Sequence, residues 1–166
     1  MDNLILAQLV YVEFAGIVPA PGEEGTITVK EACELFFAAH DRKEIMERVS
    51  MTKTAAFVLE KMAQTERFCN AQLFGYINDI SKEEQSQFSV VCVRLDDKSI
   101  YVSFSGTDNT IVGWRENFNM GYLSETPGQL KAVDYLNHMV KEDWKKIRVG
   151  GHSKGGNLSR IRIRQM

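Results

Sequence analysis

The chain is poor in cysteine and proline, and it carries no large excess of charge of either sign. Its cysteines, Cys33, Cys69 and Cys92, are odd in number, scattered and flanked by apolar residues. That pattern argues against a disulfide framework or a zinc site, and we expect all three to serve as small structural hydrophobes. A net charge of −2 gives no electrostatic reason to expect a nucleic-acid partner. No metal or cofactor is expected.

Long hydrophobic runs are also missing. The apolar N-terminus lacks the basic start of a signal peptide, and Asp2, Gln8 and Glu13 interrupt it before it could span a bilayer. We therefore expect a cytoplasmic chain with no integral membrane segment. A length of 166 residues with 44% hydrophobic residues suits one globular domain.

The first part of the chain, residues 1–70, has mainly helical patterns. Thr28 and Glu31 form a capping box that predicts a helix running to about His40. Further helices are expected from Lys43 to Val49 and from Thr54 to Phe68. A first helix is predicted by apolar residues at helical spacing: Leu6, Leu9, Val10 and Phe14.

Residues 71–158 alternate between strand and helix patterns. Predicted strands are Leu73–Ile80, Gln87–Leu95, Ser99–Phe104 and Lys146–Gly150, with a hairpin turn at residues 96–98. Predicted helices cover Trp114–Phe118 and a stretch after Pro127, whose apolar face is Leu130, Val133, Leu136, Met139 and Val140. This order predicts an α/β fold with crossover helices and a mixed sheet that is mainly parallel. Residues 159–166 form an atypical tail.

A short glycine-rich segment, Gly151-His152-Ser153-Lys154-Gly155, directly follows the last predicted strand. In G-x-S-x-G elbows a serine occupies a sharp strand-to-helix turn, and small neighbours give the crowded backbone room. Ser153 would be the nucleophile, and the Lys154 backbone N–H would donate to an oxyanion. A plain structural turn is the alternative, whereas the spacing excludes a Walker phosphate loop.

A second loop follows Phe104, at the same end of the predicted sheet. Gly106 would let this loop approach a substrate, and Thr107 could donate through its N–H and hydroxyl. Asp108 or Thr110 could instead cap the next helix, and both roles are compatible. Ligands in α/β sheets bind at the carboxyl ends of strands, where both loops are expected.

Two segments resemble known lipase-like families. Val102-Ser103-Phe104-Ser105-Gly106-Thr107, followed by Trp114-Arg115-Glu116-Asn117, is similar to the F-R-G-T…W…N/D pattern of class 3 lipases. Gly150–Leu158 more closely resembles the bacterial Mbeg-like α/β-hydrolases, whose elbow typically reads G-H-S-K-G-G-N-L-A, and so do Leu6–Tyr11 and Gln129–Leu136. The resemblance implies an α/β-hydrolase fold acting on a small ester or lipid-like substrate. It also implies a Ser153 nucleophile, with Thr107 and Lys154 as the oxyanion hole.

The chain departs from these families in two ways. Ser105 stands where class 3 lipases usually have arginine. Ser159–Met166 alternates basic and apolar residues, as an amphipathic strand does, where the family continues with a buried helix.

The residues after Ser153 include no Asp, Glu or His, although α/β-hydrolases order their triad Ser, acid, His. His40, His138 and His152 are poor substitutes, because a base needs hydrogen-bond reach. We expect a shortened or frameshifted hydrolase with little activity and an exposed sheet edge able to self-associate. The alternatives are a non-catalytic binding module and a partner polypeptide that supplies the missing half.

Overall fold

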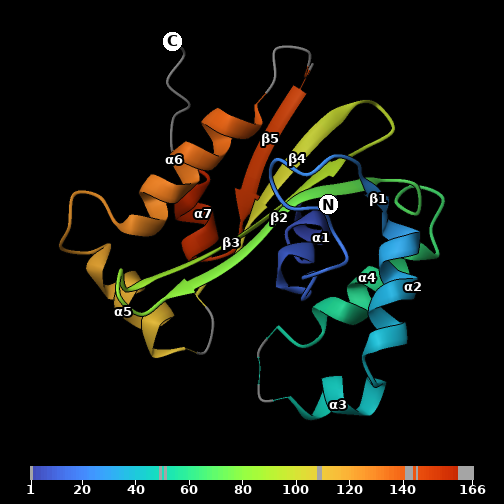
Figure 1. The fold of residues 1–166 in the computed structure, drawn as a ribbon, viewed down its shortest axis with the longest axis horizontal. Coiled ribbons are helices and arrows are strands. Elements are labelled where there is room, and N and C mark those ends of the chain that lie inside the picture. Colours follow the sequence, from blue (N-terminus) through green and yellow to red (C-terminus); the bar gives the residue numbers. More distant parts are fainter. Residues whose placement is uncertain are drawn as a thin grey trace.

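The computed structural model describes residues 2–48, 50, 52–107, 110–140, 144 and 146–160. Its helices are α1 Asp2–Leu6, the short 3₁₀ helix η1 Leu9–Tyr11, α2 Val29–Ala39, α3 Arg42–Glu47, α4 Ala55–Ala63, α5 Ile111–Asn119, α6 Pro127–Met139 and α7 Lys154–Leu158. Its strands are β1 Ile27–Thr28, β2 Gln72–Ser81, β3 Ser86–Arg94, β4 Ser99–Phe104 and β5 Lys146–Gly151. Figure 1 shows helices on both sides of one sheet.

The first third of the chain is helical, apart from the two-residue strand β1. The predicted capping box is confirmed at α2, where the Thr28 hydroxyl accepts from the Glu31 N–H and Glu31 accepts from the Thr28 N–H. The first predicted helix is wrong in extent, because α1 ends at Leu6 and η1 follows it. The four residues that predicted it are buried nevertheless: Leu6, Leu9, Val10 and Phe14.

The five strands form one sheet in the order β1-β2-β3-β4-β5. Among the described residues three of its four strand pairs are antiparallel, and the β4–β5 pair is parallel. The expectation of a mainly parallel sheet is therefore wrong, although the sheet is mixed as predicted. The tight turns after β2 and β3 leave no room for a crossover helix, so those pairs must run antiparallel.

Two hydrophobic cores lie on opposite faces of the sheet. Along β3, Val91 and Val93 contribute to the core under α1, η1, α2 and α4, whereas Val90 and Cys92 contribute to the core under α6 and α7. This alternation follows from the two-residue period of a strand, and it buries β3 on both faces. The sheet thus lies between two helical layers (Figure 1).

Helix α6 is the principal crossover element between β4 and β5. The helix begins at Pro127, next to the start that the sequence predicts, and the structure adds a Thr126–Gln129 capping box in its first turn. The predicted packing face is wrong at Leu130, which is 49% exposed; the buried positions are Gly128, Ala132, Tyr135 and Leu136. Tyr135 fixes that rotation, because its hydroxyl donates to the Gly75 carbonyl at 2.6 Å.

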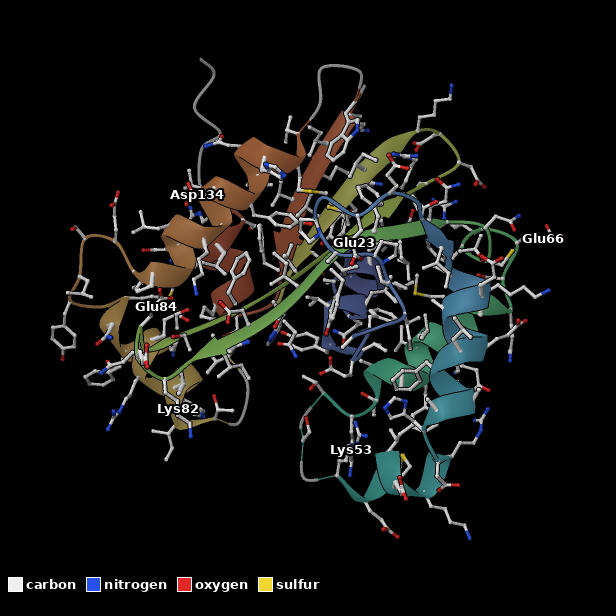
Figure 2. The ribbon with its side chains drawn as sticks, in the orientation of Figure 1. Glu23, Lys53, Glu66, Lys82, Glu84 and Asp134 are labelled. Carbon is white, nitrogen blue, oxygen red and sulfur yellow. The ribbon has the colours of Figure 1, made fainter. Side chains whose placement is uncertain are left out.

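The three cysteines lie in or near the interior, and several charged side chains lie at the outer rim of the molecule. Cys33 and Cys92 are buried and Cys69 is half-buried, and all three are free thiols. Lys53, Glu66 and Lys82 lie at the outer rim (Figure 2).

No helix in the described ranges is long and apolar enough to cross a membrane. Of the predicted tail, Ser159 and Arg160 form a turn after α7, and residues 161–166 lie outside the described residues.

Candidate functional site

The two predicted functional loops leave neighbouring strands at the same end of the sheet. Strands β4 and β5 are parallel, and their ladder ends where Phe104 pairs with Gly151. Beyond this pair the chain enters the Gly106–Thr107 loop on one side and the Ser153 turn on the other. A Cβ placed on Gly106 would lie 3.4 Å from the Ser153 Cβ, so the structure brings the two loops into contact.

Ser153 occupies a backbone conformation that glycine tolerates and other residues rarely adopt. Its φ is 56° and its ψ is −121°, between the end of β5 and the first residue of α7. Such a conformation in a non-glycine residue stores strain of about 1–3 kcal/mol, and it persists only where the surrounding structure enforces it. The side chain is exposed, so the hydroxyl is presented to solvent on a sharp strand-to-helix turn.

Glycines make the sharp turn possible by close backbone contact with β4. A Cβ on Gly151 would lie 2.3 Å from the Phe104 carbonyl oxygen, and one on Gly155 would lie 2.2 Å from the same atom. Both positions therefore exclude any side chain. Gly156 is less restricted, because its Cβ would meet only the Gly151 oxygen at 3.3 Å. Of these three glycines, Gly151 and Gly155 are thus strictly required.

The Gly106–Thr107 loop is held by a residue from the start of the chain. The Gly106 N–H donates to the Tyr11 hydroxyl at 2.8 Å, and burial raises the pKa of that phenol, which keeps it protonated. The Thr107 hydroxyl oxygen is buried and has no hydrogen-bond partner among the described residues. Thr110 caps α5 through the Gly113 N–H, whereas Asp108, the other predicted cap, lies outside the described residues.

Lys154 follows the nucleophile position, and its side chain turns into the protein. The ammonium is fully buried and donates to the Gln87 carbonyl at 2.5 Å, the Gln87 side-chain oxygen at 2.8 Å and Glu116 at 2.7 Å. The Glu116 carboxylate also accepts from the N–H groups of Gln87 and Gly128. A buried charge is tolerated only when it is paired and hydrogen-bonded, and this pair meets both conditions.

The same buried network reaches the other loop. Ser105 is 3% exposed, and its hydroxyl accepts from the Gln87 side-chain nitrogen at 3.1 Å. One glutamine on β3 therefore contacts both the elbow and the loop after β4.

Comparison with protein families gives a match that includes both loops. The Mbeg1-like family matches residues 62–165, which is more than half of the chain. The chain belongs to the Mbeg1-like family. No curated protein and no solved structure matches it.

In this Mbeg1-like chain no histidine of the described residues contacts the Ser153 hydroxyl. His40 ends α2, where its Nδ1 lies 3.0 Å from the Phe36 carbonyl oxygen and its ring stacks on Phe36. His138 is exposed on α6. His152 is exposed beside Ser153, and its backbone carbonyl accepts from the Gly155 N–H. Within the described ranges, no group of three metal-ligating side chains gathers either.

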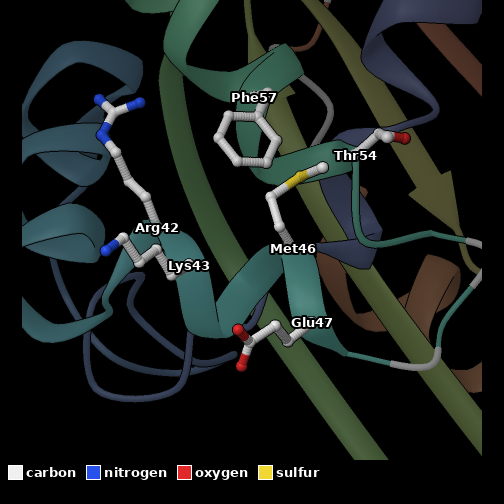
Figure 3. Close-up of a pocket in the computed structure, with 6 residues that line it drawn as sticks. All are labelled: Arg42, Lys43, Met46, Glu47, Thr54 and Phe57. Carbon is white, nitrogen blue, oxygen red and sulfur yellow. The ribbon is translucent and has the colours of Figure 1, made fainter.

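A hollow of about 620 Å³ lies between α3 and α4, in the helical layer across the sheet from α7 (Figure 3). It is lined by Arg42, Lys43, Met46, Glu47, Thr54 and Phe57. These residues place neither a serine nor a cysteine nucleophile in the hollow, so we do not assign it to the chemistry at Ser153.

Sequence reasoning missed the supporting residues of the site in this family member. Tyr11 and Glu116 fall inside segments whose family resemblance was recognised, so that resemblance was the available signal. Gln87 lies in no such segment, and a lone glutamine at the start of a strand is normally interpreted as a surface residue. The buried course of the Lys154 side chain was also unforeseen.

Proposed function

We propose that this Mbeg1-like chain has the scaffold of a serine acyl hydrolase related to class 3 lipases, with Ser153 as its nucleophile. The observation that carries the proposal is the exposed Ser153 at φ 56° in a strand-to-helix turn next to the Gly106–Thr107 loop. Serine nucleophiles of α/β-hydrolases sit on such strained turns, with a second oxyanion donor from an earlier strand-to-helix loop.

In the proposed reaction the Ser153 oxygen attacks the ester carbonyl carbon while a base takes the hydroxyl proton. The carbonyl oxygen becomes an oxyanion that would accept from the Lys154 and Thr107 N–H groups, and the buried Thr107 hydroxyl is a further donor. The alcohol then leaves with a proton, and water hydrolyses the acyl-enzyme.

A small ester or lipid-like substrate fits the surroundings better than a peptide. Helix α5, which begins shortly after Thr107, exposes the apolar side chains of Ile111, Trp114 and Phe118. A hollow of about 710 Å³ lies along this helix; it is lined in part by the apolar face of α5, and its lining residues include no nucleophile, so it would bind only the acyl chain. Apolar surface of this kind is suited to an acyl chain, whose burial is favourable at every methylene.

The base is what the proposal lacks, since none of the three histidines is positioned for it. Without a base, an oxyanion hole and substrate binding alone retain roughly 10³–10⁴-fold catalysis over water. A non-catalytic binding module built on the same scaffold is therefore the second candidate, favoured by the positions of His40, His138 and His152.

The test is covalent labelling by a fluorophosphonate probe, compared among the chain, Ser153→Ala and Ser159→Ala. Ser159 is the matched control, because it follows the same elbow but bonds its hydroxyl to the Gly156 carbonyl. We expect slow labelling that Ser153→Ala abolishes and Ser159→Ala retains. Labelling that survives in Ser153→Ala, or none in any variant, would favour the binding module.

A further inference from the structure

Gln87 joins the two candidate oxyanion loops through a single side chain. It is 3% exposed and lies near the start of β3. Its side-chain oxygen accepts from the ammonium of Lys154, the residue that follows Ser153 in the sequence. Its side-chain nitrogen donates to the hydroxyl of Ser105, the residue that precedes Gly106. The glutamine therefore bridges the loops beyond the point where the β4–β5 ladder ends.

The orientation of the Gln87 amide is determined by its partners. An ammonium only donates hydrogen bonds, so the amide oxygen must face Lys154 and the NH₂ group must face Ser105. The Gln87 backbone is fixed as well, because its carbonyl accepts from Lys154 and its N–H donates to Glu116. Rotating this side chain would leave buried polar groups without partners, which is costly.

We propose that Gln87 is a positioning residue that sets the spacing between the Lys154 and Thr107 oxyanion donors. This inference rests on the proposed acyl-transfer function. Two donors stabilise one oxyanion only if both lie about 2.7–3.1 Å from it, and a displacement of about 1 Å can cost roughly a hundredfold in rate. The β4–β5 ladder ends at the Phe104–Gly151 pair, before either donor, so the Gln87 bridge adds a constraint beyond it.

The test uses Gln87→Met, which removes both hydrogen bonds of the side-chain amide and keeps an unbranched side chain. Lys154 stays paired with Glu116 and the Gln87 carbonyl in this variant, so we expect it to fold. Ser105→Ala cuts the opposite end of the bridge, and the double variant tests whether both changes act on one connection. Gln72→Met is the matched control, because Gln72 bonds Arg94 at the far end of β2.

The first measurement is hydrogen exchange in peptides that cover residues 104–107 and 152–156. If Gln87 couples the loops, Gln87→Met raises exchange in both by about tenfold or more, with no comparable change in β2 or β3. Gln72→Met leaves both loops as they are. Unchanged exchange in the loops, or a uniform rise throughout the sheet, would overturn the inference and leave Gln87 a purely structural residue.

The second measurement is the kinetics of Ser153 labelling by a fluorophosphonate. We expect Gln87→Met and Ser105→Ala each to lower the maximal labelling rate about tenfold, with an unchanged half-saturating probe concentration. The double variant should be no slower than the slower single variant, since one bridge is cut twice. Fully multiplicative losses would contradict a shared bridge. If the unaltered chain shows no Ser153-dependent labelling, the proposed function fails, while the exchange data still decide whether Gln87 couples the loops.

Discussion

At the scale of single residues, Ser153 holds a strained backbone conformation. A φ of 56° and a ψ of −121° are imposed by the crowding of Gly151 and Gly155 against the Phe104 carbonyl. Strained non-glycine residues of this kind cluster at active sites and ligand sites, where the surrounding structure enforces them. The strain therefore makes a prediction about stability that is separate from the prediction about labelling.

We expect Ser153→Gly to be more stable than Ser153→Ala by about 1 kcal/mol, because glycine relieves the strained φ at some entropic cost. Both variants lose the hydroxyl, so the difference reports the backbone alone. The matched position is Ser159, whose φ is −70°, where glycine should be about 0.5–1 kcal/mol less stable than alanine. Urea unfolding of the four variants measures this. Glycine less stable than alanine at both positions would contradict the strain.

The cysteines give a second prediction at this scale. Burial raises the pKa of the Cys92 thiol to about 12, and burial also raises that of Cys33, whereas Cys69 is half-exposed. Only the thiolate reacts with a disulfide reagent. Titration with such a reagent near pH 8 should therefore show one fast thiol in the folded protein and three after unfolding. Cys69→Ser should remove the fast phase, and its persistence would place Cys33 or Cys92 nearer the surface.

At the scale of elements, features fixed by neighbouring residues could be predicted from the sequence, whereas features fixed by long-range contacts could not. The Thr28 cap and the turn after β3 depend on residues a few positions apart, and the structure has them where the sequence predicts them. The elbow turn at Ser153 is equally local. The rotation of α6 depends on Tyr135 reaching Gly75, sixty residues away, and no window of sequence contains that contact.

The buried pair that ties α5 to α7 was unpredictable for the same reason, since Glu116 and Lys154 lie 38 residues apart. We expect Lys154→Met to cost about 3–5 kcal/mol of unfolding free energy, because it leaves the Glu116 carboxylate buried and uncompensated. Lys131→Met is the control. That lysine is 28% exposed and pairs with Asp79 and Glu84 near the surface, so its loss should cost under about 1 kcal/mol.

Chemical denaturation of both variants, together with Lys154→Met/Glu116→Leu, measures how much the Lys154–Glu116 pair contributes to the free energy of unfolding. The double variant should recover part of the loss, because replacing both buried charges removes the unpaired one. Equal costs for Lys154→Met and Lys131→Met would show that Lys154 is hydrated in solution.

At the scale of the whole molecule, stability should fall across the sheet from its centre to β5. Strand β3 lies between β2 and β4, and both of its faces are buried by helices. Within the described residues β5 pairs only with β4, and none of its positions is fully buried. An unpaired strand edge also offers its backbone groups to another chain.

Native-state hydrogen exchange at low protein concentration should therefore show β3 opening only with global unfolding and β5 opening at a lower free energy. Raising the protein concentration separates two states of the β5 edge. If the edge pairs with a second molecule, exchange in β5 slows with concentration while exchange in β3 does not change, and light scattering detects the dimer. If β5 stays fast at every concentration, self-association through this edge is wrong. Protection of β5 equal to that of β3 in the dilute monomer would contradict the proposed gradient, because it would require the edge strand to open only when the whole sheet does.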